Sequence, residues 1–182
     1  MTCPSPDAPV ELAPYDPAWP SRFAQERIAI RGALGDLIVG SIEHVGSTAI
    51  PGVGAKPILD IMVGIRDLSA PGLLVPLLGR IGYVHYPYRP DVMHWFCKPS
   101  PSFRTHHVHA VPVGSRLWRE RIAFRDYLRA HADVATAYVE LKRQLAASHR
   151  FDREAYTDGK TSFVGKVLAA AMPEDGGPGY DA

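Results

Sequence analysis

The sequence contains no long apolar run, no block of basic residues and almost no net charge. Its 182 residues include 20 basic and 19 acidic side chains, which give a formal net charge of +1. A nucleic-acid partner requires a local basic patch, and because no run of basic residues supplies one, nucleic-acid binding is not indicated. A membrane-spanning helix requires about 20 consecutive apolar residues. Every apolar stretch here is far shorter, so we expect no segment that crosses a membrane.

Cysteine is also scarce, with only Cys3 and Cys97 in the whole chain. This usage is typical of a reducing compartment, and we do not expect a disulfide between the two. The first residues have neither the basic segment nor the apolar segment of a secretory signal peptide. Together these features favour a cytoplasmic protein.

The length is that of one domain, and an apolar fraction of 46% is ample for a hydrophobic core. Residues 1–9 contain spaced prolines without periodicity and are expected to form a flexible lead. Residues 173–182 are rich in glycine and acidic residues and are expected to be a disordered tail. Between them we expect a single domain over residues 10–172, in which residues from about 115 to 172 form helices.

Hydrophobic periodicity divides this domain into helical and extended segments. Asp16 and Pro17 are typical of a helix start, as the N-cap and the first helical residue. The nearly continuous apolar run at 57–63 indicates a central strand buried on both faces. Further strands are expected at 10–15, 41–46, 83–88, 92–98 and 104–112, and further helices at 68–80, 115–129, from 133, and from 152 to before 173. This order is α+β and differs from the regular βαβ alternation of a Rossmann sheet.

Asp60 is the strongest single indication of function. A lone carboxylate within an apolar strand is costly to bury unless it is paired, hydrogen-bonded or bound to a metal. One reading is therefore a metal ligand. The other is a structural aspartate that accepts hydrogen bonds from the backbone or from Lys56.

The Gly46-Ser47 pair favours a functional role for Asp60. A strand that ends in Gly-Ser and continues into a loop of small residues offers backbone N–H groups and a hydroxyl to phosphate oxygens. The loop at 47–56 is long enough to return the chain and to place Asp60 on an adjacent strand. A divalent metal held by Asp60 would then meet a phosphate that rests on the loop.

Several segments together resemble the GrpB protein family. The most specific is EHVGSTAIPGVGAKPILDIM at 43–62, and it is joined by YDPAW at 15–19, HVH at 107–109, FRDYL at 124–128, and REAY at 153–156 with Lys160. The resemblance covers roughly residues 10–168. The family is grouped with the nucleotidyltransferase superfamily. The resemblance therefore implies a nucleotidyltransferase-like mixed or antiparallel sheet with flanking helices and a C-terminal helical cap.

The resemblance also implies an active site that pairs a Gly-Ser loop with metal-binding carboxylates. Carried onto this sequence, it gives Asp60 and Ser47 as catalytic residues. It gives the following residues as binding a nucleotide or another phosphorylated small molecule: Gly46, Ser47, Thr48, Lys56 and Lys160. The superfamily pattern has a second acid two residues after the first, but this chain has Met62 there. A standard site for two magnesium ions needs shared carboxylates, and Met62 cannot supply one.

His107 and His109 are candidates to replace the missing acids. Residues i and i+2 of a strand point to the same face, so both imidazoles should project together, with His106 directed to the other face. With Asp60 they would form a His-His-carboxylate site, whose ligands suit zinc, iron or manganese better than magnesium. The alternative is a pair that hydrogen-bonds within a polar sheet face or contacts phosphate. His94 on a neighbouring strand is a further candidate by proximity.

Lys160 lies on a helical stripe with Tyr156 and Phe163 that otherwise faces the core. Its ammonium either extends to solvent or overhangs the sheet and meets an anionic ligand. Three hypotheses of function remain open at this point. The first is a protein that binds a nucleotide or phosphorylated small molecule with a divalent metal (Mg, Mn or Zn) and transfers a nucleotidyl group. The second is a non-catalytic ligand sensor, and the third is a metal-dependent hydrolase that uses Asp60, His107 and His109.

Overall fold

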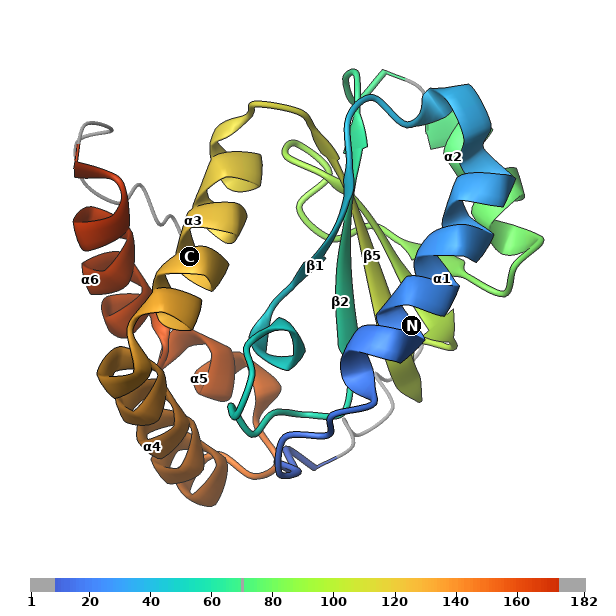
Figure 1. Cartoon of the computed structure of the whole chain (residues 1–182). Coiled ribbons are helices and arrows are strands. Elements are labelled where there is room, and N and C mark those ends of the chain that lie inside the picture. The colour runs from blue at the N-terminus through green and yellow to red at the C-terminus, as the bar shows by residue number, and fades with distance from the viewer. Residues whose placement is uncertain (1–8, 70, 174–182) are drawn as a thin grey trace.

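A five-stranded mixed sheet between two layers of helices forms the centre of the molecule (Figure 1). The computed structural model describes residues 9–69 and 71–173. Its strands are β1 (Ile42–Val45), β2 (Leu59–Ile65), β3 (Val84–Tyr86), β4 (His94–Pro99) and β5 (Arg104–Pro112). Its α-helices are α1 (Trp19–Leu34), α2 (Pro71–Gly79), α3 (Arg116–Ala130), α4 (Ala132–Ser148), α5 (Arg153–Asp158) and α6 (Thr161–Ala171). The α+β class expected from the sequence is confirmed.

The strands lie in the order β1-β2-β5-β4-β3. Only β2 and β5 are paired in parallel, while the other three neighbouring pairs are antiparallel. The connection from β2 to β5 therefore runs through α2, β3 and β4 before the chain returns to the centre of the sheet. This pairing brings residues near 60 beside residues near 107.

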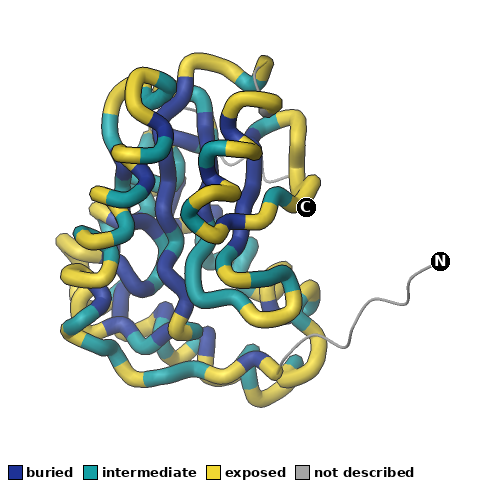
Figure 2. Tube along the Cα trace, turned by 90° about the vertical axis from the view of Figure 1, so that its right-hand side faces the viewer, coloured by how far each residue is buried: buried dark blue, intermediate teal, exposed yellow. Residues whose placement is uncertain are grey.

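Alternation along the strands gives the sheet two different faces. Ile61 and Val63 of β2 point to the face that α1 and α2 cover, where Trp19, Ile30 and Leu78 complete the main core. Met62 points to the opposite face and packs with a smaller cluster that includes Trp118 of α3. Figure 2 shows the resulting pattern, with the buried stretches gathered inside a mostly exposed outer layer.

The C-terminal helices form a separate cap that packs on the loop between β1 and β2. Ile50 and Val53 of this loop are buried against Leu128, Tyr138 and Val167. The loop begins with one turn of 3-10 helix, Ser47–Ala49. The expected helical cap is therefore present, and it encloses the loop that the sequence marks as a phosphate-binding segment.

Three expected elements differ from the observed ones. Residues 10–15 do not join the sheet edge, because Ala13 pairs with Ala55 of the loop in an isolated bridge. The first helix begins at Trp19 and not at Pro17, since the Asp16 carboxylate accepts a hydrogen bond from the Ala18 N–H in a turn that precedes the helix.

The expected last helix is in fact two, α5 and α6, which are separated at Gly159 and Lys160. A Cβ on Gly159 would lie against the Leu145 side chain of α4, so close packing between helices requires glycine at this position. Asp152 is the N-cap of α5, because its side chain accepts a hydrogen bond from the Ala155 N–H.

The predicted lead at 1–9 and tail at 173–182 lie, apart from Pro9 and Pro173, outside the described residues. Within the described part of the chain, no helix is long and apolar enough to cross a bilayer. Cys97 is a buried free thiol on β4.

Candidate functional site

Asp60 occupies the second position of β2, with Val45 of β1 on one side and His107 of β5 on the other. Its side chain is 28% exposed, so the carboxylate lies at an accessible part of the sheet face. Gly46 lies directly against it, and a Cβ at that position would be 2.5 Å from Asp60 Oδ2. The sequence prediction that the Gly-Ser turn and Asp60 adjoin each other is therefore confirmed in its geometry.

His107 and His109 meet Asp60 because β5 pairs with β2 in register. His107 lies opposite Asp60, and His109 lies opposite Met62. Asp60 Oδ1 is 3.0 Å from His107 Nδ1 and 3.2 Å from His109 Nε2. One ligand atom from each of the three side chains lies within 4.8 Å of the other two. These are the atoms that would converge on a cation.

Each ring nitrogen of His109 has a hydrogen-bond acceptor beside it. Its Nε2 faces the Asp60 carboxylate, and its Nδ1 lies 3.4 Å from the thioether sulfur of Met93. Both neighbours are acceptors, whereas a neutral imidazole carries only one N–H donor. A neutral ring therefore leaves one nitrogen lone pair against an acceptor. A second proton on the ring, or a metal ion at Nε2, would remove this conflict.

Electrostatics oppose the second proton. Burial is the largest influence on His109 and lowers the pKa of its imidazole to about 4, although the Asp60 carboxylate acts in the opposite direction. Burial also opposes ionisation of Asp60, but hydrogen bonds from His107 and His109 outweigh it and hold the pKa of the carboxyl well below its ordinary value. At neutral pH the arrangement is an ionised carboxylate with a neutral His109.

His107 contributes a further unsatisfied atom. Its Nδ1 contacts Asp60, while its Nε2 is buried and has no hydrogen-bond partner in the described part of the chain. The ring packs against Trp95 of β4, with 4.8 Å between the ring centroids. The indole fixes the orientation of the imidazole, and the sequence analysis did not identify this contact.

The turn after β1 is more tightly built than a simple loop. Thr48 is 1% exposed, and its hydroxyl donates a hydrogen bond to the Ile58 carbonyl. His44 Nε2 lies 3.0 Å from Thr48 Oγ1. The Thr48 side chain is therefore engaged inside the fold. Ser47 is less buried and directly follows Gly46, whose carbonyl accepts a hydrogen bond from the Ala49 N–H.

Two lysines flank Tyr156 beneath this turn. Lys56 Nζ lies 5.0 Å from the centroid of the Tyr156 ring, and Lys160 Nζ lies 4.5 Å from it. Burial and the neighbouring Lys56 ammonium lower the pKa of Lys160 to about 8, although Asp60 partly opposes this shift. Lys160 is therefore half-buried near other charges, and its contact with an anionic ligand stays a prediction.

Lys142 of α4 is a further lysine near this group, and no sequence pattern indicates that it is buried. It is 2% exposed, and its ammonium donates to the Gly54 carbonyl of the loop. Burial and the nearby Lys160 lower the pKa of Lys142 to about 7. Because α4 has a regular amphipathic pattern, no local signal separates this lysine from the solvent-exposed ones.

Two other histidines do not join the site. His94 lies opposite Ala110 and is directed to the α1 side of the sheet, where its Nε2 contacts the Leu68 carbonyl. The suggestion that it adds to the cluster is therefore wrong. His106 alternates with His107 along β5 and lies opposite Leu59, as expected.

Comparisons with known proteins agree with the resemblance seen in the sequence. The family model described as GrpB protein matches residues 9–170. The chain belongs to the GrpB family. A UPF0157 protein of Pseudomonas aeruginosa, PA4798, is 45% identical over 170 residues, with 91% of this chain and 69% of that protein covered. A UPF0157 protein of Deinococcus radiodurans is 39% identical over 163 residues, with 89% and 82% covered.

The fold of this GrpB-family chain is also that of a solved relative. The crystal structure of conserved protein GrpB from Enterococcus faecalis superposes with a TM-score of 0.81 at 32% identity. The match covers 91% of this chain and 99% of the Enterococcus faecalis chain.

The close contact between Gly46 and Asp60 leads to a prediction about stability. Gly46 has φ 70° and ψ −173°, a conformation essentially restricted to glycine. Gly46→Ala should lower the free energy of unfolding by about 2 kcal/mol more than Gly52→Ala, because overpacking adds to the backbone strain. Gly52 is the matched control, since it has φ 77° but open space around its Cβ position. Urea unfolding measures both variants, and equal losses would contradict the contact with Asp60.

Lys142 leads to a prediction about pH. The pKa of Lys142 in the folded chain is about 7, against an ordinary value of 10.5. The unfolded chain therefore binds more protons between these two values, and the contribution of Lys142 to stability should rise with pH across that window. Lys142→Met should abolish this rise, and below pH 7 it should stabilise the fold by about 1–3 kcal/mol.

Thermal melts between pH 6 and pH 10 would test this expectation. The control is Lys166→Met, which removes an exposed lysine from α6. If the difference between Lys142→Met and the wild type is independent of pH, Lys142 is not a buried cation of this kind.

Proposed function

We propose that the chain binds a nucleotide or another phosphorylated small molecule together with a divalent metal held by Asp60, His107 and His109. The observation that carries this proposal is His109, whose two ring nitrogens both face acceptors. A metal ion at Nε2 satisfies this ring without protonating a buried imidazole. The two histidines and one carboxylate form a donor set that suits zinc, manganese or iron(II), so the residues present fit such an ion.

The surroundings of this centre supply what a phosphate needs. Gly46 lies directly against Asp60, and the turn that it opens would offer backbone N–H groups and the Ser47 hydroxyl to phosphate oxygens. Lys56 and Lys160 carry positive charge beside Tyr156. These cations repel each other, so an anion between or near them would relieve the repulsion. A divalent cation at the centre would supply a Lewis acid for a phosphoryl oxygen.

Nucleotidyl transfer is the chemistry that a nucleotidyltransferase-like fold suggests. The position of the second superfamily acid holds Met62, which is fully buried beside His109. This observation favours a second candidate function, a metal-dependent hydrolase in which the two histidines and Asp60 hold the ion. The two functions differ in the fate of a nucleoside triphosphate. A transferase consumes it only with an acceptor, whereas a hydrolase consumes it in water alone.

The metal centre is tested first by metal content. After reconstitution with Zn²⁺ or Mn²⁺ and gel filtration, the wild-type protein should retain the ion, and His107→Ala/His109→Ala should retain none. His106→Ala is the matched control, because it removes a neighbouring histidine that points to the other face of the sheet. Equal metal content in the double variant and the control would refute the assignment of the ligands.

Asp60→Asn separates ligand binding from a structural role. The substitution keeps the size of the side chain but removes the charge that would hold a cation. Metal-dependent stabilisation by a nucleoside triphosphate should fall by about 1–3 kcal/mol, the usual scale of coupling between two ligands. The metal-free variant should be less stable than the wild type, because it loses the charge that the hydrogen bonds from His107 and His109 stabilise in the fold.

Thermal melts of both proteins, with and without metal and nucleotide, measure these effects. If Asp60 is only structural, the metal-free fold weakens in the same way, but the metal-dependent response to nucleotide is unchanged. Thermal stabilisation by a nucleoside triphosphate that is consumed neither in water alone nor with an acceptor would identify a ligand sensor.

A further inference from the structure

A cavity lies along the free edge of β1, and its lining does not include Asp60. Its volume is about 630 Å³, which is in the range of small-molecule sites. Helix α1 forms one wall and α3 the other, while Ser41 to His44 form the floor. None of its lining residues belongs to the metal centre or to the lysine group around Tyr156.

The charges that line this cavity are unbalanced. Four arginines line it (Arg27, Arg31, Arg125 and Arg129), together with a single acidic residue, Glu43. Arg27 and Arg31 lie four residues apart on α1, and both are exposed. Within the described residues no carboxylate forms an ion pair with either of them. The α1 wall therefore presents two positive charges that the protein itself does not neutralise.

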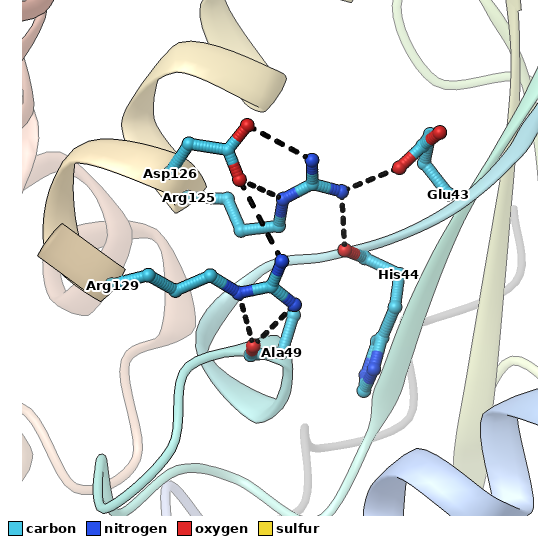
Figure 3. A network of polar contacts seen from close by, with 6 residues as sticks. All are labelled: Glu43, His44, Ala49, Arg125, Asp126 and Arg129. Carbon is cyan, nitrogen blue, oxygen red and sulfur yellow. Dashed lines mark hydrogen bonds and ion pairs between the residues drawn. The ribbon is translucent and has the colours of Figure 1, made fainter.

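The α3 wall is rigid. Arg125 is buried, with Nη1 2.6 Å from Glu43 Oε2 and Nε 2.8 Å from Asp126 Oδ1. Arg129 donates from Nε and Nη2 to the Ala49 carbonyl at the end of the cavity (Figure 3). Glu43 and Asp126 offset the charges of these two guanidinium groups, so Arg27 and Arg31 account for the net positive field.

The floor of the cavity excludes an added peptide strand. β1 has only four residues, and the His44 carbonyl on its outer side already accepts a hydrogen bond from Arg125 Nη1 at 3.1 Å. An incoming strand would need that carbonyl for its own ladder. The occupant must therefore be a compact molecule and not an extended chain.

Apolar surface completes the site. The Phe23 ring stacks on the His44 imidazole, with 4.8 Å between centroids and 11° between the planes. Tyr15 also lines the cavity, as does Ile28, which is 71% exposed. An exposed isoleucine at the mouth of a cavity provides contact for an apolar group of a ligand. We propose that this cavity binds a small organic anion, a carboxylate or phosphate ester that bears an apolar or aromatic group.

Matched naphthalene probes test the proposal: 1-naphthoate and 1-naphthyl phosphate as anions, and 1-naphthol as the neutral analogue. Titration of the metal-free full chain, followed by amide NMR shifts and probe fluorescence, should show binding of the anions at Phe23, Ile28 and Glu43. The neutral analogue should bind at least about tenfold more weakly, because it cannot form charge-assisted hydrogen bonds. The relative affinity of the carboxylate and the phosphate shows which acid group the site prefers.

Arg27→Gln/Arg31→Gln should weaken anion binding by about tenfold while leaving the melting temperature unchanged, since both side chains are exposed. The control is Arg66→Gln/Arg80→Gln, which removes the same charge from exposed positions outside the cavity and should keep the wild-type affinity. His107→Ala/His109→Ala should also keep it, so that failure of the metal proposal would not affect this result. The inference would be overturned if 1-naphthol bound as tightly as the anions, or if both arginine double variants lost the same affinity. Amide shifts centred on Asp60 would also overturn it.

Discussion

The parallel pairing of β2 with β5 sets the positions of Asp60, His107 and His109, the three side chains of the proposed metal centre. It joins strands that are separated by two others in the sequence, and its register places His107 beside Asp60 and His109 beside Met62. A shift of one residue would send the histidines to the other face of the sheet. Val108 and Ala110 of β5 would then leave the main core, so the packing that stabilises the fold also fixes the site. The register of β2 and β5 thus determines both which apolar side chains are buried and where the polar cluster lies.

Local pattern was sufficient to predict much of this arrangement. The apolar run around Asp60 indicated a central strand, and the i, i+2 spacing of His107 and His109 placed both imidazoles on one face. The GrpB resemblance directed attention to Gly46, which proves to lie against Asp60. These features depend on residues close in sequence or on the alternation of a single strand, which is why the sequence reveals them.

Other features depend on contacts between distant segments and leave no local signal. Lys142 has the spacing of an ordinary helical lysine, yet it is buried against the Gly54 carbonyl. Arg125 contacts Asp126 of its own helix, but it also donates hydrogen bonds to Glu43 and to the His44 carbonyl, which lie about 80 residues earlier in the chain. The break between α5 and α6 lies at Gly159, where a Cβ would contact the Leu145 side chain of α4. The stripe of Tyr156, Lys160 and Phe163 reads as one continuous helix because this contact cannot be seen in it.

The loop between β1 and β2 has a consequence for the order in which the protein is made. Its carbonyl groups at Ala49 and Gly54 are held by Arg129 and Lys142, which follow 80 and 88 residues later in the chain. During translation, the glycine-rich segment leaves the ribosome long before α3 and α4, with Ile50 and Val53 not yet covered. Segments of this kind depend on chaperones or on rapid completion of the domain. The first half of the chain therefore contains the Gly-Ser motif, but side chains from the second half hold the loop in its folded conformation.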